Sequence, residues 1–127
     1  MENGEITMHI NTHTINDKKA AEVVAGRIVI ESEQDGLDLL GDLYYQGFDQ
    51  IIIHEKDITP DFFDLRNGMA GEILQKFSTY RMQLAIVGNF EKYPGKSIRE
   101  FIYESNRWGH VSFVGTLSEA LAQLSRI

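Results

Sequence analysis

Hydrophobic and polar residues alternate near the beginning of the chain. Ile6, Met8 and Ile10 are separated by polar residues, and this period of two is typical of a strand with one buried face. A second strand is predicted at Arg27–Ile30, which can pair back antiparallel to the first. The chain is therefore expected to start with a hairpin-like pair of strands.

The apolar spacing then changes to that of a helix. Ser32 can cap its first turn, and Gly47 can end it. Between them, apolar residues recur at helical spacing, at Leu37, Leu40, Leu43 and Tyr44. The compact apolar run within Asp49–His54 follows, and it predicts a central strand that is buried on both faces.

Two helix starts are expected after this strand. Thr59–Pro60 pairs a capping hydroxyl with a proline and predicts a single turn of helix. The second start is expected at Asp64. An apolar stripe that can lie on the sheet follows it; this stripe consists of Met69, Ile73 and Phe77, with Ala70 and Leu74 beside them.

The remaining elements complete an α/β pattern. Gln83–Gly88 is a further buried strand, Ile98, Phe101 and Ile102 mark a third helix, and His110–Val114 is the last strand; Thr116–Glu119 is a capping box that opens a fourth helix. The predicted order is strand, strand, helix, strand, helix, strand, helix, strand, helix. We therefore expect residues 1–127 to form a single α/β domain, with four helices and a five-stranded mixed sheet whose later strands are parallel.

Composition narrows the range of functions. The chain has 127 residues with 43% hydrophobic content, which suffices for one ordinary core. Its 19 acidic and 12 basic side chains give a formal net charge of -7, and the basic residues are scattered, so we expect no nucleic-acid partner. Cysteine is absent, and no apolar stretch approaches the ~20 residues of a membrane span. A cytoplasmic protein without a membrane partner is expected.

Candidate site residues lie where parallel strands end. Open parallel sheets bind ligands outside the carboxyl ends of their strands. Three loops are expected to converge there, beginning at His54–Lys56, Gly88–Asn89 and Gly115–Thr116. The stretch Asp64–Asn67 is expected behind the first of these loops. His54 and Asn89 lie in the first two loops, and they are therefore candidate binding residues as well.

The helix entrance at Asp64 has two interpretations. Arg66, Asn67 and the unpaired backbone N–H groups of a helix N-terminus can contact a small anion or a protein partner. Alternatively, the stretch is only a cap, in which Asp64 accepts from its own backbone, Arg66 is solvated, and Gly68 and Gly71 allow close approach to the sheet.

Two other patterns in the sequence could suggest a bound cofactor or metal ion, but neither has the required spacing. Gly95–Ser97 resembles the end of a phosphate-binding P-loop, but its spacing from Gly88 is wrong; Ser97 as a helix cap explains it more simply. His9 and His13 on one strand would be ~13 Å apart, too far to share a metal ion. We therefore predict neither a cofactor nor a metal site.

Catalytic and interface candidates are few. His54 and Glu55 form the one plausible acid–base pair, although adjacent residues in an extended chain point to opposite faces. Arg107 and Trp108 precede the last predicted strand. An exposed tryptophan there would be an interface anchor, and a buried one would close an edge of the core.

Several segments resemble known families. The passage from Ile51 to Gly88, with a buried strand, a polar loop, an Asp, an amphipathic helix and a second strand, resembles the STAS domains, whose familiar members are anti-sigma factor antagonists. More closely, FDLRNGMAGEILQKF, YRMQLAIVGNF, SIREFIYESNR and TLSEAL resemble an uncharacterised bacterial family of STAS-like domains of unknown function. The STAS resemblance implies a non-enzymatic switch that is phosphorylated on a serine at the helix entrance. This chain has Arg66 and Asn67 there, so phosphorylation is not expected.

Three hypotheses follow. The first is a STAS-like regulatory or binding module that acts through Asp64–Met69, with another protein or a second copy of the chain as its partner. The second is a small enzyme that uses His54, Glu55 or Asp64 with Arg66, which requires these groups to converge in a pocket. The third is a structural domain whose helix faces serve only homodimerisation.

Overall fold

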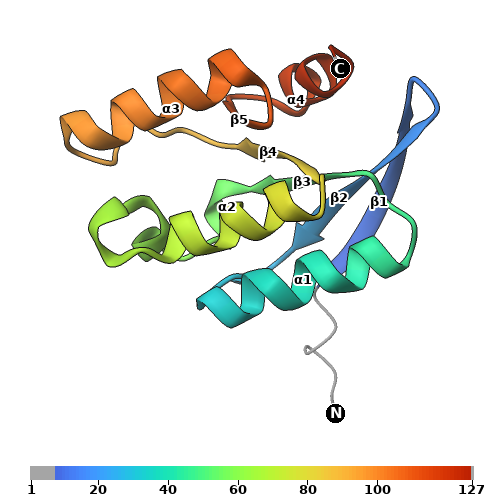
Figure 1. Ribbon diagram of the computed structural model, residues 1–127, viewed down its shortest axis with the longest axis horizontal. Helices are drawn as coiled ribbons and strands as arrows, with labels where there is room; N and C mark the ends of the chain where they lie inside the picture. The colour runs from blue at the N-terminus through green and yellow to red at the C-terminus, as the bar shows by residue number, and fades with distance from the viewer. Residues whose placement is uncertain (1–7, 127) are drawn as a thin grey trace.

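The computed structural model, which describes residues 8–126, contains one five-stranded mixed sheet in the order β1-β2-β3-β4-β5 (Figure 1). The strands are β1 (Met8–Ile15), β2 (Lys18–Ala25), β3 (Gln50–His54), β4 (Gln83–Val87) and β5 (Val111–Val114). β1 pairs antiparallel with β2, and every later pair is parallel. The predicted fold class, a small α/β domain with a five-stranded mixed sheet, is confirmed.

Four helices complete the predicted order: α1 (Glu33–Tyr45), α2 (Met69–Thr79), α3 (Lys96–Trp108) and α4 (Leu117–Leu124). Ser32 caps α1 and Thr116 opens α4 with a capping box, as predicted. Three single turns of 3-10 helix lie between β3 and α2, at Glu55–Asp57, Pro60–Phe63 and Leu65–Asn67. Among the described helices, none combines the length and the apolar character needed to cross a membrane.

The two faces of the sheet carry separate cores. Helices α1, α2 and α3 share one face, since right-handed crossovers between adjacent parallel strands place their helices together. The apolar stripe of α2 packs here through buried Ala70, Ile73 and Phe77, as predicted. On the other face α4 packs on β4 and β5, and buries Ala120 and Leu124 in a smaller core.

The second strand is not where the sequence pattern suggested. Residues Arg27–Ile30 are not a strand; Ile30 makes only an isolated parallel bridge with Ile58. The chain reverses earlier because Asn16 and Asp17 have φ values of 50° and 70°, as in the two-residue turns that suit β-hairpins. The prediction at Arg27–Ile30 was therefore wrong, and β2 is the strand that completes the hairpin.

Two positions of the predicted apolar patterns are exposed. Met8 in the edge strand β1 is 40% exposed and Tyr44 on α1 is 46% exposed, because no element covers either side chain fully. Ile10 is partly buried against the larger core. Ile6, which the first predicted strand also included, lies outside the described residues.

Candidate functional site

The loops after β3 and β4 are joined through a buried carboxylate. Glu55, which immediately follows β3, is 6% exposed. The Tyr93 hydroxyl donates a hydrogen bond to it, and the Lys92 Nζ lies 2.8 Å from its Oε2 atom. Burial raises the pKa of Tyr93 above its ordinary range, and the hydrogen bond and charge of Glu55 raise it further. Glu55 thus connects the loop after β3 with the loop after β4 at the carboxyl ends of these strands.

Asp64 caps a 3-10 turn, and not α2 as predicted. Its Oδ1 accepts from the Arg66 N–H at 3.3 Å. The two carboxylate oxygens also accept from the Arg66 Nε and Nη2 atoms at 3.0 and 3.1 Å. These hydrogen bonds from Arg66 lower the pKa of Asp64. The pair is exposed, since 91% of the Arg66 side chain is accessible, and this agrees with the expected solvated arginine.

Asn67 holds the entrance of α2. Its Oδ1 accepts from the Met69 N–H at 2.9 Å, and its Nδ2 donates to the Asp61 carbonyl at 2.7 Å. Gly68 follows with a φ of 82°, a conformation that favours glycine. A Cβ built at Gly68 or Gly71 meets nothing within 4 Å, so the expectation that these glycines allow close approach was wrong. Asn67 has a clear structural role here.

A cleft of about 440 Å³ separates this turn from the start of α3, and we call it the Arg66 cleft. One wall is made by Pro60, Phe63, Asp64, Leu65 and Arg66, and the other by Tyr93–Ile98. Tyr93 stacks on Phe63 with ring centroids 4.3 Å apart, so the two walls are in contact at these rings. The cleft therefore joins predicted site residues to a segment distant in sequence.

The start of α3 contributes a second cation to the Arg66 cleft. Lys96 is the first helical residue, and Gly95 occupies the N-cap position without a side-chain hydrogen bond. Ser97 is consequently inside the helix and does not cap it, contrary to prediction. The Lys96 Nζ lies 3.8 Å from the Glu100 carboxylate, and its side chain is 80% exposed. A weak exposed ion pair of this kind leaves the ammonium available to another anion.

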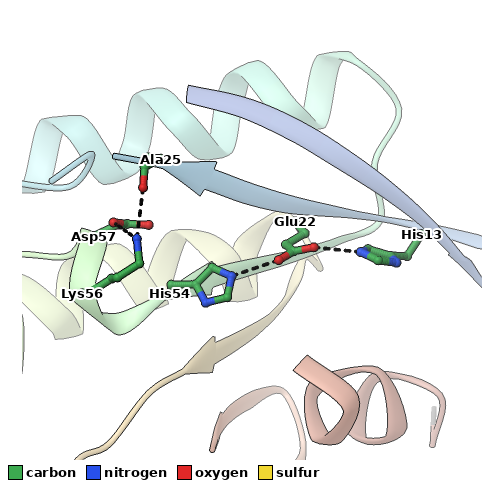
Figure 2. Close-up of polar contacts among 6 residues, drawn as sticks. All are labelled: His13, Glu22, Ala25, His54, Lys56 and Asp57. Carbon is green, nitrogen blue, oxygen red and sulfur yellow. Dashed lines mark hydrogen bonds and ion pairs between the residues drawn. The ribbon is translucent and has the colours of Figure 1, made fainter. Parts of the chain in front are cut away.

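His54 points toward Glu22, whose carboxylate lies between His54 and His13 (Figure 2). Its Nε2 lies 2.9 Å from Glu22 Oε2, and the Nε2 of His13 lies 3.0 Å from the other oxygen. Burial raises the pKa of Glu22, but hydrogen bonds from His13, His54 and Asn11, with the charge of His54, outweigh it and leave the pKa below its ordinary value. This cluster was not predicted, because the β1–β2 and β2–β3 registers are both needed to bring these residues together.

The loop after β3 is also tied to the end of β2. The Lys56 Nζ donates to the Asp57 Oδ1 at 2.9 Å and to the Ala25 carbonyl at 3.0 Å, as Figure 2 shows. Asp57 is buried at 2% exposure. Lys56 therefore neutralises a buried carboxylate and holds neighbouring strand ends together.

The remaining predicted residues lie apart from the Arg66 cleft. Asn89 uses its Oδ1 to accept from the Glu91 N–H at 3.1 Å, which closes a local turn. Trp108 is 78% exposed and does not close the core. Arg107 lies beside it in sequence, with its Nη1 3.6 Å from a Glu104 oxygen. An interface role for Trp108 and Arg107 stays a prediction.

The three candidate catalytic groups do not converge. His54 pairs with Glu22, Glu55 with Tyr93 and Lys92, and Asp64 with Arg66. His54, Glu55 and Asp64 thus each form hydrogen bonds or ion pairs with their own neighbours and not with one another. The arrangement is suited to holding loops and presenting cations, and it contains no shared acid–base centre among these residues.

Comparison with known proteins places the chain in a family. Neither the curated proteins nor the solved structures gave a match. A family model matches residues 15–124, which span all four described helices and β2 to β5. The chain therefore belongs to the family described as Domain of unknown function (DUF4180).

Proposed function

We propose that this chain is a cytoplasmic, non-enzymatic STAS-like binding module whose Arg66 cleft recognises a carboxylate- or phosphate-bearing segment of another protein. The observation that carries this proposal is that Arg66, from a 3-10 turn, and Lys96, from the start of α3, line one cleft. Both side chains are largely exposed. Two cations on opposite walls suit an anionic group that enters between them.

The geometry of Arg66 supports this role. Asp64 uses the Nε and Nη2 atoms of the guanidinium, while Nη1 has no hydrogen-bond partner among residues 8–126. Asp64 thereby orients the planar group and leaves donors for a ligand. The lining residues Pro60, Leu65 and Tyr93, which are exposed or partly exposed, provide apolar surface for the rest of a bound segment.

The STAS resemblance supports a binding role without phosphorylation. β3, the turn at Asp64–Asn67, α2 and β4 follow one another in the order that the resemblance implies. Asn67 stands where a phosphorylatable serine would be expected, and its amide is occupied by Met69 and Asp61. Regulation of this module would therefore depend on partner availability and not on modification at Asn67.

The test is a titration of the ¹⁵N-labelled chain followed by NMR. The probes are inorganic phosphate, acetate and a phosphoserine-containing peptide. We expect saturable shifts of the Arg66, Lys96 and Ser97 amides, which disappear in the Arg66→Ala/Lys96→Ala double variant. Lys76→Ala is the matched control, because it removes an exposed charge from α2 outside the cleft. Equal shifts in the double variant and the wild type would contradict the proposal.

A further inference from the structure

β1 is a long and regular edge strand. All eight of its residues pair with β2 without a bulge, and within residues 8–126 no strand lies on its outer side. The β1–β2 hairpin reaches beyond the rest of the sheet in Figure 1, and only Ala20–Val23 of β2 pair with β3. β1 therefore presents a row of outward backbone donors and acceptors.

The edge lacks the features that usually prevent strand pairing. Its sequence, MHINTHTI, contains no lysine, arginine, aspartate, glutamate, proline or glycine. Proteins commonly protect exposed edges with charges, prolines, bulges or short strands. The opposite edge strand, β5, has four residues, and both α3 and α4 pack against it. Only β1 combines length, regularity and freedom from charge among the five strands.

We propose that β1 pairs antiparallel with β1 of a second copy of this chain across a two-fold axis. Such an isologous contact satisfies the outward groups of both strands at once. A second copy suits this edge, because two antiparallel β1 strands bring no Lys, Arg, Asp or Glu side chains of β1 together, although each chain carries a formal net charge of -7. The two sheets then form one continuous sheet through the dimer.

Pairing centred on Asn11 gives compatible neighbours. Met8 then lies opposite Thr14 of the second copy, and Ile10 lies opposite Thr12, on the face that carries the larger core. This pairing covers the exposed side chain of Met8. The β-branched residues Ile10, Thr12 and Thr14 also suit a paired strand.

Sedimentation equilibrium over a wide range of protein concentration tests the proposal. The wild type should form a dimer of twice the 14.5 kDa chain mass. Thr12→Lys places one charge from each copy near the centre of the contact, and should raise the dimer dissociation constant by about tenfold or more. Ser78→Lys, at an exposed position of α2, adds the same charge elsewhere and should leave dimerisation unchanged.

Hydrogen exchange of the wild type provides a second measurement that needs no variant. Amides of β1 should become more protected as protein concentration rises, while amides of α3 should not. A monomer at the highest concentration would overturn the proposal and leave the edge for a strand from a different protein. Equal dimerisation by wild type and a folded Thr12→Lys, or β1 protection that does not depend on concentration, would also overturn it.

Discussion

Gly88 lies directly against Glu55, so that a Cβ built at Gly88 would be 2.3 Å from the Cβ of Glu55. This contact brings the end of β4 against the loop after β3. It also places Glu55 where the Tyr93 hydroxyl and the Lys92 ammonium reach its carboxylate. The close packing of Gly88 against Glu55 therefore requires a residue without a side chain at position 88.

Replacing Gly88 with alanine should destabilise the fold. The added methyl group cannot fit without moving the Glu55 backbone, and overpacking of this kind costs about 2–3 kcal/mol. Gly41→Ala on α1 is the matched control, because its Cβ meets nothing within 4 Å; helix propensity predicts a gain of about 0.5–1 kcal/mol there. Urea denaturation measures both changes, and a Gly88→Ala protein as stable as wild type would contradict the close contact.

Tyr93→Phe should lower stability and change its dependence on alkaline pH. Removing the hydroxyl takes a hydrogen bond from the buried Glu55, at a cost of about 1.5 kcal/mol, while the ring can still stack on Phe63. The pKa of Tyr93 is raised above its ordinary value near 10, so the unfolded chain loses this proton first. The stabilisation is complete below about pH 10 and is lost as the pH rises toward the folded-state pKa.

Urea denaturation at several pH values from neutral to alkaline separates the two effects of Tyr93. The wild type should lose stability above about pH 10 more steeply than Tyr93→Phe. The two proteins should differ most at neutral pH and converge as the pH rises. Parallel curves over the whole range would show that the hydroxyl is not linked to folding.

The order of the elements and the apolar stripe of α2 were predictable from sequence, and the contacts between distant side chains were not. The stripe of Met69, Ile73 and Phe77 and the capping box at Thr116 depend only on spacing within one helix. In contrast, the bond between Tyr93 and Glu55 joins residues 38 positions apart. The same applies to the Arg66 cleft, since no sequence spacing relates its two walls.

The wrong position predicted for the second strand explains why the cluster of His13, Glu22 and His54 was not predicted. With a strand expected at Arg27–Ile30, Glu22 had no predicted partner on β1. The actual register places Glu22 on the strand between His13 and His54, and the three side chains then meet. Recognising the turn at Asn16–Asp17 would have corrected the register, because a two-residue turn fixes the pairing of the strands it joins.

Glu22→Gln should weaken the fold and flatten its response to acid. The change removes the charged acceptor that His13 and His54 share, which costs about 1–3 kcal/mol at neutral pH. The folded-state pKa of Glu22 is lowered from its ordinary value of 4.5. Its contribution is therefore present above that value and is lost as the pH falls through the folded-state pKa.

Thermal unfolding at several pH values between neutral and strongly acidic measures this effect of Glu22. The difference in stability between wild type and Glu22→Gln should shrink as the pH falls below about 4.5. Asp38→Asn on the exposed surface of α1 is a control that removes a carboxylate outside the cluster. If Glu22→Gln and Asp38→Asn had the same acid profiles, the cluster would contribute no specific pH dependence.

Asn67 should prove to be a structural residue of the turn that presents Arg66 to the Arg66 cleft. Asn67→Ala removes the acceptor for the Met69 N–H and the donor to the Asp61 carbonyl, and loss of these exposed hydrogen bonds costs about 1 kcal/mol. Asn67→Asp keeps the acceptor and loses the donor, so its stability should be intermediate. Denaturation in urea ranks the three proteins, and phosphate titration by NMR asks whether the folded variants still bind. A stable Asn67→Ala protein that no longer binds phosphate would reverse this assignment, because Asn67 would then contact the ligand and not merely hold the turn that presents Arg66.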